Sequence, residues 1–207
     1  MINKIDHIVI AVPNLEEGIL WIEKKLGVRP VYGGLHTTEG THNALLNLGN
    51  ECYLELLAVD FSNIKINAPR WMGVDLIDEP TVTRWAVKSK NLEEEIVFLK
   101  NINPLLRNFK AGSRVKSDGT VLKWQLSIPL PEPKVEVTPF LIDWGNSTHP
   151  TASLESQCEL VDFNLTHPQP SVIQEVIRNI NLDFEIKKGA EAKITIKIRC
   201  PKGIVEL

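Results

Sequence analysis

The stretch Ile5–Gly27, IDHIVIAVPNLEEGILWIEKKLG, decides the fold because it joins a buried strand directly to an amphipathic helix. Its first part is almost entirely apolar and ends at Val12. Asn14 then stands where a helix N-cap is expected, with Glu17 three residues later as in a capping box. Apolar residues follow at every third or fourth position until a glycine stops the pattern after Leu26. The stretch therefore predicts one strand and one helix in immediate succession.

The same pattern returns 77 residues further along the chain, in Val82–Ile102, VTRWAVKSKNLEEEIVFLKNI. Asn91 and Glu94 take the two capping positions, and Val87 aligns with Ile10 of the preceding strand. Two segments with the same spacing of capping and apolar residues indicate an internal repeat.

A weaker third copy, again a strand and then a helix, lies in Leu160–Asp183, and two more strands follow it. The strands expected after the first two helices are Arg29–Tyr32, Asn43–Leu48 and Cys52–Val59, and then one around Arg114, Val121–Ile128 and Val137–Trp144. We therefore expect an α+β protein. Two paired units fill residues 1–150 (repeat 1 about 4–60, repeat 2 about 81–145), and a partial third βαββ unit in 151–207 packs on the same domain.

Composition and charge exclude several classes of function. The 207 residues are 43% hydrophobic and 24% charged, as in an ordinary globular protein. A net charge of −3 gives no basic field for nucleic acid or for a membrane surface. No apolar run has the length of a spanning helix, and no signal peptide is recognised. The three cysteines lack CxxC spacing and are expected to be reduced thiols. These features predict a cytoplasmic protein with no nucleic-acid partner and no membrane partner.

Short motifs accompany the repeats. They are Asp6-His7, Gly33-Gly34 with His36, Gly40-Thr41 with Asn43, Tyr53-Leu54-Glu55, Trp85, Asp118-Gly119 with Leu122 and Trp124, and Pro139-Phe140 through Ile142-Asp143-Trp144. Together with the tandem unit, these motifs resemble the vicinal oxygen chelate superfamily, which includes glyoxalases, fosfomycin-resistance proteins and extradiol dioxygenases. Within it, the chain is most similar to the glyoxalase-like domain family. The resemblance implies that paired βαβββ units curl one mixed sheet into a cup that holds a divalent metal.

The resemblance also assigns candidate metal ligands. In the superfamily each unit gives one ligand from its first strand and one from its last, which implies His7 and Glu55 here. Strand parity agrees, because Ile8, Ile10 and Val12 share the face that packs on helices and His7 lies on the other face. A carboxylate within an apolar strand is costly unless it is paired, bound to metal or turned toward a wet cavity. The alternative is that the two side chains simply hydrogen-bond each other as buried polar groups.

The second repeat departs from this pattern. At the 77-residue offset, Arg84 takes the position of the first-strand histidine, and Phe140 falls opposite Glu55. Arginine cannot ligate a metal because it offers only donors and stays protonated. Either His36 or His42 would complete a set of two histidines and one carboxylate, which suits Zn, Fe, Ni or Mn. The alternative is that both are plain surface residues, as histidines in loops more often are.

Parity adds candidate substrate-binding residues. The apolar residues of Val121–Ile128 alternate, so Lys123 and Gln125 are expected on the opposite face, toward the cup. By the same argument Asn43 also faces the cup, and cations at Arg84, Lys123 and Arg114 would gather there. Such a group of cations suggests an anionic ligand, for example a carboxylate or a phosphonate. The alternative for Lys123 and Arg114 is a solvated rim.

Two classes of function follow. The first is an enzyme in which metal at His7 and Glu55 acts as a Lewis acid on vicinal oxygens of a small substrate, with Glu55 also as base. Lyase, isomerase and transferase chemistry are favoured over dioxygenase chemistry, because the dioxygenases of the superfamily that the chain resembles normally draw their iron ligands from the second repeat. The second is a metal-free protein that binds an organic anion through Arg84. The His7–Glu55 pair favours the enzyme. An exposed edge at ITIKIRC near the C-terminus would favour a homodimer.

Overall fold

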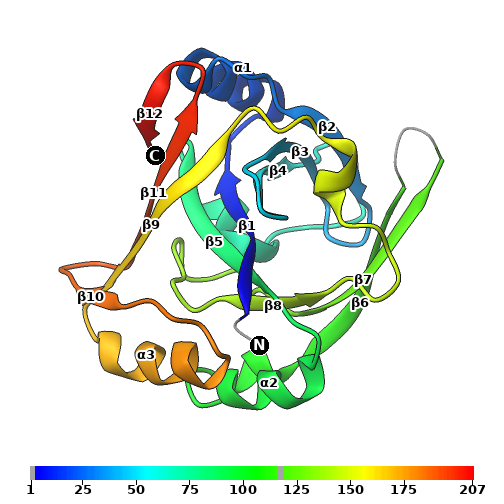
Figure 1. Ribbon diagram of the computed structural model, residues 1–207. Coiled ribbons are helices and arrows are strands. Elements are labelled where there is room, and N and C mark those ends of the chain that lie inside the picture. Colours follow the sequence, from blue (N-terminus) through cyan, green and yellow to red (C-terminus); the bar gives the residue numbers. More distant parts are fainter. Residues whose placement is uncertain (1–2, 116–118) are drawn as a thin grey trace.

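The computed structural model describes residues 3–115 and 119–207, so Asp118 of the motifs lies outside the described residues. Strands and helices follow one another as shown in Figure 1. Their bounds are β1 Lys4–Ala11, α1 Leu15–Leu26, β2 Val31–His36, β3 Thr41–Asn47, β4 Tyr53–Val59, β5 Thr81–Lys88, α2 Leu92–Leu99, β6 Phe109–Val115, β7 Val121–Ser127, β8 Phe140–Asp143, β9 Glu159–His167, α3 Pro170–Asn179, β10 Ile186–Lys188, β11 Lys193–Cys200 and β12 Gly203–Glu206. The described ranges also contain the short 3-10 helices η1 Trp71–Leu76, η2 Pro104–Arg107 and η3 Pro150–Ser153.

Eight strands form one curved, mixed sheet in the order β2-β3-β4-β1-β5-β8-β7-β6. In each repeat the first strand pairs in parallel with the last, β1 with β4 and β5 with β8. The two repeats meet where β1 and β5 run side by side in antiparallel pairing, in the middle of Figure 1. The predicted α+β fold with a cup of two βαβββ units is confirmed.

Side chains close the gap between the two ends of this sheet. Lys110 of β6 forms an ion pair with Glu39, which follows β2. Arg114 of β6 donates from Nη1 to Asn43 Oδ1 of β3 at 3.1 Å. The sheet is therefore nearly closed, and we call this junction between β2–β3 and β6 the seam.

The two faces of the sheet pack into separate cores, as β1 shows. Ile8, Ile10 and Val12 pack with the apolar faces of the helices on the outside. Val9 and Ala11 belong to a second cluster, rich in aromatic residues, that lines the inside of the cup. The predicted parity of β1 is therefore confirmed.

The first helix begins and ends where the sequence predicts. Asn14 Oδ1 accepts a hydrogen bond from the Glu17 backbone N–H, and Gly27 adopts a left-handed φ of 77°. The predicted strand at Arg29–Tyr32, however, is shifted and extends to His36, with an irregular register between Tyr32 and Gly34. In the described part of the chain, no helix is both long and apolar enough to cross a membrane.

The third repeat adds a four-stranded sheet in the order β10-β9-β11-β12. It packs on the outer face of the cup through Phe163 and Phe184, whose rings lie 4.9 Å and 5.3 Å from that of Trp85. β10 was not predicted. β11 pairs with β9 on one side and, over Lys197–Cys200, with β12 on the other, so much of the edge on which the predicted homodimer rested is covered.

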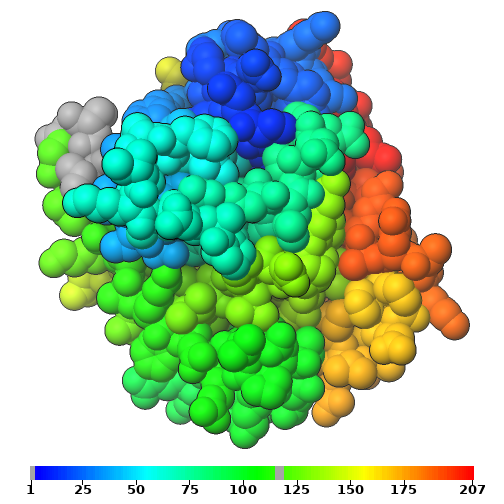
Figure 2. Space-filling model, turned by 180° about the vertical axis from the view of Figure 1, so that it is seen from behind, coloured from blue at the N-terminus to red at the C-terminus, as the bar shows by residue number. Residues whose placement is uncertain are grey.

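The segment between β4 and β5 covers the inside of the cup. Trp71 and Met72 of η1 belong to the inner cluster, and the Met72 backbone N–H donates to the carbonyl of Leu130 at 3.1 Å. Figure 2 shows this segment, in cyan to blue-green, on the face turned toward the viewer. The connection between β4 and β5 thus meets the connection between β7 and β8 over the cup, and both reduce the space inside it.

Candidate functional site

His7 lies on the inner face of β1 with a partner at each ring nitrogen. Its Nδ1 is 2.6 Å from Asp6 Oδ1, and its Nε2 is 3.5 Å from Glu55 Oε2. The register of β1 against β5 shifts at Asp6, and a bulge of this kind changes the direction of a side chain. The predicted meeting of His7 and Glu55 in the cup is therefore seen, with Asp6 as an additional partner.

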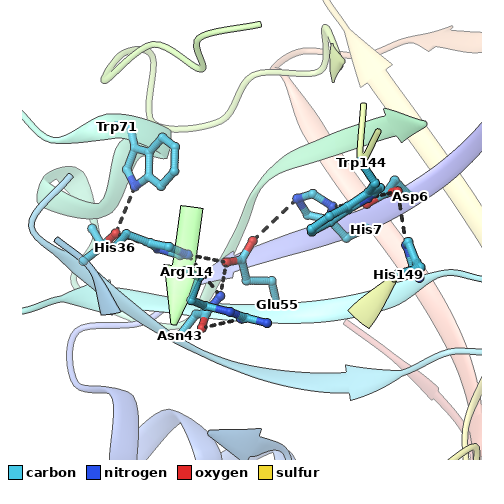
Figure 3. A network of polar contacts seen from close by, with 10 residues as sticks. Asp6, His7, His36, Asn43, Glu55, Trp71, Arg114, Trp144 and His149 are labelled. Carbon is cyan, nitrogen blue, oxygen red and sulfur yellow. Dashed lines mark hydrogen bonds and ion pairs between the residues drawn. The ribbon is translucent and has the colours of Figure 1, made fainter. Parts of the chain in front are cut away.

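Asp6 is fully buried and is surrounded by donors (Figure 3). Trp144 Nε1 donates to its Oδ2 at 2.9 Å, and His149 Nε2 lies 3.2 Å from the same atom. Burial alone raises the pKa of Asp6, but the hydrogen bonds from His149 and His7 outweigh it and lower this pKa to about 2. An ionised carboxylate only accepts, so His7 Nδ1 carries a proton and Nε2 is the atom available toward Glu55.

Glu55 is held from its other side by an amide. Asn43 Nδ2 donates to Glu55 Oε1 at 2.6 Å, and Arg114 Nη1 donates to Asn43 Oδ1 at 3.1 Å. Figure 3 shows the carboxylate between His7 on one side and Asn43, Arg114 and His36 on the other. Asn43 therefore links the guanidinium at the seam to the carboxylate inside the cup.

His36, at the end of β2, is the second histidine of the cup. Its Nδ1 is 3.1 Å from Thr41 Oγ1, which also accepts from Trp71 Nε1 at 3.1 Å. Its Nε2 is 4.0 Å from Glu55 Oε1. Burial lowers the pKa of His36 to about 4, against the opposing effect of Glu55, so the ring is neutral at neutral pH.

These polar groups and several rings surround an inner cavity of about 30 Å³. The rings that complete its wall are Tyr53, Trp71, Trp124, Phe140 and Trp144. Space of this size holds one or two water molecules but no organic ligand. A larger outer cavity of about 600 Å³ lies at the seam, between β2, β7 and the segment 146–154. Arg114 lines both cavities.

Two predicted residues of β7 point away from the cup. Lys123 and Gln125 are exposed on its outer face, whereas Leu122, Trp124 and Leu126 are buried and belong to the inner cluster. The predicted alternation is right, but the faces were assigned in reverse. The physical reason is that the inside of the cup is itself apolar here, so the buried face of β7 is the inner one.

Arg84 is buried, and its hydrogen bonds go to backbone carbonyls of the protein. Its guanidinium donates to the backbone carbonyls of Thr83, Leu130, Pro133 and Lys134 at 2.6–3.1 Å. Burial lowers the pKa of Arg84 to about 10, which leaves it charged at neutral pH. Among the described residues, those that line the two cavities do not include Arg84. Its contacts thus correct the expectation of an anion anchor, because they fix the connection before β8.

His42 also lies away from the inner cavity. Thr41 and Asn43 are directed inward, so the residue between them belongs to the opposite face of β3, where it is half-buried. Of the two histidines considered as a third ligand, the structure brings His36 to Glu55 and leaves His42 outside.

His7, His36 and Glu55 provide a test of the predicted metal site. Two imidazoles whose Nδ1 atoms have partners and one carboxylate suit a divalent transition metal chemically. Asn43 Nδ2, however, lies 2.6 Å from Glu55 Oε1 and 3.4 Å from His36 Nε2, so an N–H donor stands where a shared metal would lie. Within the described ranges, no group of three or more His, Cys, Asp or Glu is arranged to hold a metal ion. In this arrangement the residues do not fit a three-ligand metal site.

Sequence reasoning missed the surroundings of Asp6. The adjacent pair Asp6-His7 was part of a motif, which was the available signal for a role of the carboxylate. The pair His149-Pro150 resembles the family, but neither spacing nor parity placed His149 beside Asp6; it lies 143 residues away and caps η3 by accepting at Nδ1 from the Thr151 backbone N–H. Its other nitrogen, Nε2, is therefore free to donate to Asp6.

The paired βαβββ units have the fold of the vicinal oxygen chelate superfamily. A family model described as a glyoxalase-like domain matches residues 5–180, and the chain belongs to this family. A hypothetical protein from Staphylococcus aureus of known crystal structure is 20% identical, with a TM-score of 0.67 over 93% of this chain and 88% of that chain. This likeness concerns the fold.

Methylmalonyl-CoA epimerases are also among the similar structures. A variant from Streptomyces coelicolor in complex with 2-nitronate-propionyl-CoA is 14% identical, with a TM-score of 0.43 over 72% of this chain and all of that chain (100%). The enzyme from Mycobacterium tuberculosis is 18% identical, with a TM-score of 0.42 over 72% of this chain and 91% of that chain. No curated protein matches the sequence.

Proposed function

We propose that this protein is an enzyme of the isomerase or lyase class that transfers a proton on a small organic anion, with His7 and Glu55 as the catalytic pair. The observation that carries the proposal is the 3.5 Å separation of His7 Nε2 and Glu55 Oε2 beside a buried cavity. A further hydrogen bond orients each member of the pair: His7 bonds to Asp6, and Glu55 accepts from Asn43. Such pairs, oriented by further hydrogen bonds, are typical of general acid–base sites.

The hydrogen bonds support a separate role for each group in this proposal. Asp6 keeps the proton of His7 on Nδ1, so that Nε2 can take a second proton from a substrate carbon next to a carbonyl or carboxylate. The imidazolium that forms lies between the charges of Asp6 and Glu55, which stabilise it. An isomerase delivers a proton to the opposite face of the same carbon or to another atom of the enolate, and a lyase instead expels a leaving group from the neighbouring carbon. Arg114 provides the positive charge for the anionic substrate.

Hydrogen–deuterium exchange at carbon tests the proposal. Small oxo, hydroxy and dicarboxylic acids are incubated with the protein in D₂O, and the loss of each C–H signal is followed by proton NMR. We expect catalysed exchange for at least one acid, and a decrease of about 10²- to 10⁴-fold in His7→Gln and in Glu55→Gln. His42→Gln is the matched control, since His42 lies outside the cavity, and it should retain the wild-type rate. Equal rates in all four proteins would contradict the assignment.

A second candidate, favoured by the small volume of the inner cavity, is a metal-free binding protein for an organic anion. With about 30 Å³ inside the cup, the reacting part of a substrate needs additional space. A binding protein would hold the same acids at the seam without exchange at carbon. Measured affinity in the absence of exchange would therefore favour this alternative.

A further inference from the structure

The inner and outer cavities meet at Arg114. This side chain, on β6, is 6% exposed and forms part of the wall of both. The outer cavity, at about 600 Å³, has the size of a typical ligand site, whereas the inner cavity at about 30 Å³ has not. Arg114 therefore lies at the boundary between the outer cavity and the cavity that holds His7 and Glu55.

Arg114 is poorly satisfied where it lies. Nη1 donates to the neutral amide oxygen of Asn43, and the buried Nε has no hydrogen-bond partner. The Nε of Arg84 is likewise buried without a partner, but the two terminal nitrogens of Arg84 donate to four backbone carbonyls. A buried donor without a partner is costly, and a guanidinium gains most from a bidentate anion. Among the described residues Arg114 thus forms no direct ion pair, and it is connected to the Glu55 carboxylate only through the amide of Asn43.

The position of Arg114 depends on a close approach of the backbone. A Cβ atom added to Gly33 of β2 would lie 2.3 Å from Asn43 Oδ1 and 2.5 Å from Arg114 Nη1. Contacts that short do not occur, so the missing side chain at this position leaves the space in which the amide and guanidinium pair. The pair is therefore formed at the seam by β2, β3 and β6 together.

The remaining wall of the outer cavity indicates the kind of molecule that fits. Apolar side chains, among them Val31, Leu122 and Leu154, alternate with hydroxyl groups of the segment 146–154, such as Thr148 and Ser153. His149, which donates to Asp6, also lines this cavity. A surface of this kind suits an organic body with both apolar and polar parts.

We propose that the outer cavity is the substrate chamber, and that it takes an organic anion whose carboxylate, phosphonate or phosphate group draws Arg114 away from Asn43. This inference rests on the proposed function and names its substrate class. A bidentate pair with an anion gives the guanidinium two hydrogen bonds and an opposite charge in place of one hydrogen bond to an uncharged amide oxygen. The exchange of partners removes the partition between the cavities and lets the reacting carbon approach His7 and Glu55.

Calorimetric titration with three probes tests the chamber. Phenylphosphonate and phenylacetate carry the anion, and phenylacetamide is their neutral counterpart. We expect wild-type protein to bind at least one anion and to bind phenylacetamide at least about tenfold more weakly, a difference of about 1.4 kcal/mol. Arg114→Gln should weaken anion binding by at least about tenfold, and Arg114→Lys by less. Lys123→Gln, which removes a cation from the outer face of the adjacent strand, should leave the Kd unchanged.

Several outcomes would contradict the proposal that the outer cavity is the substrate chamber. They are the absence of anion binding by the wild type, an affinity that does not change in Arg114→Gln, and equal affinity for phenylacetamide. Should Arg114→Gln fail to fold, nitrogen NMR of the wild type replaces it, because the Arg114 Nε–H signal must shift during titration with phenylphosphonate. An unshifted signal with saturated protein contradicts the proposal.

His7→Gln separates this inference from the proposed function. It should abolish exchange at carbon but leave the Kd of the anion within about twofold of the wild-type value, because His7 lines only the inner of the two cavities. If the protein catalyses exchange but its affinity for the anion does not depend on Arg114, the proposed chamber is wrong and the catalytic pair is supported. If binding depends on Arg114 but no exchange occurs, the chamber is supported and the catalytic pair is wrong.

Discussion

The two halves of the cup follow the same path of the chain but use their first strands differently. His7 of β1 faces a carboxylate across a small cavity, whereas Arg84, its counterpart on β5, donates to backbone carbonyls of the chain that leads to β8. Opposite Glu55 of the first half, the second half carries the ring of Phe140. The repeat thus specifies the backbone pairing, while the role of each side chain depends on what the rest of the fold places across from it.

The glycines beside the cup make the same contrast. Gly33 on β2 leaves space for Asn43 and Arg114. Gly112 on β6 leaves space for an indole instead, since a Cβ there would lie 2.4 Å from Trp124 Nε1. The glycine in the first half therefore makes room for a polar pair, and the glycine in the second half makes room for an aromatic side chain of the cup wall.

The largest effect that would separate the halves is expected at Arg84. Arg84→Met leaves the carbonyls of Leu130, Pro133 and Lys134 without their donor, and we expect a loss of about 3 kcal/mol or more in the free energy of unfolding. Urea denaturation measures this loss. Arg107→Met, the same change at an exposed position of η2, should alter stability by less than about 0.5 kcal/mol. A similar small change at both positions would show that Arg84 is not a structural residue, and the contrast with His7 would fail.

The first half should respond to pH through His36. Its pKa falls from 6.5 in the unfolded chain to about 4 in the folded protein, so the unfolded state binds more protons between these values. Stability should be complete above about pH 6.5 and decrease as the pH falls toward 4, by on the order of 3 kcal/mol. Urea denaturation at a series of pH values measures the slope.

His36→Gln should reduce this slope, and His167→Gln, a histidine outside the cup, should leave it unchanged. Asp6 does not interfere, because its pKa is lowered from 3.8 to about 2 and its contribution is lost only as the pH falls through that lower range. Parallel pH profiles of the wild type and His36→Gln would contradict the assignment of a buried neutral ring.

A smaller effect, on metal affinity, would show whether a single substitution converts the polar cluster of the first half into a metal site. Asn43→Asp replaces the N–H donor between Glu55 and His36 by a carboxylate, and we expect the affinity for Zn²⁺ or Mn²⁺ to rise by at least about tenfold. Calorimetry gives the affinity, and plasma mass spectrometry of protein purified without chelators gives the bound metal. Asn50→Asp on the surface is the control.

The metal content of the wild type determines how the result for Asn43→Asp is interpreted. The prediction of one divalent metal from the sequence would gain support if wild-type protein already bound metal stoichiometrically and lost it in both His7→Ala and Glu55→Ala. In that case the amide of Asn43 would not be the obstacle that the geometry indicates.

The sequence by itself determined the repeat and the backbone that follows from it. Capping residues such as Asn14 and the alternation in β1 act over a few neighbouring positions, so they can be read without knowledge of distant contacts. The same local parity, with the resemblance to a family, was sufficient to bring His7 and Glu55 together. Parity could not tell which face of β7 is inside, and Lys123 and Gln125 were placed on the wrong side for that reason.

Tertiary structure decided how the site is completed. Asp6 receives its donors from Trp144 and His149, and Arg114 meets Asn43 across the seam, all at large separations in sequence. No local pattern encodes such pairs, because they form only when the two ends of the curved sheet come together. The chain alone therefore specified a cup with a histidine and a carboxylate inside, and only its closure determined the charges and hydrogen bonds that surround them.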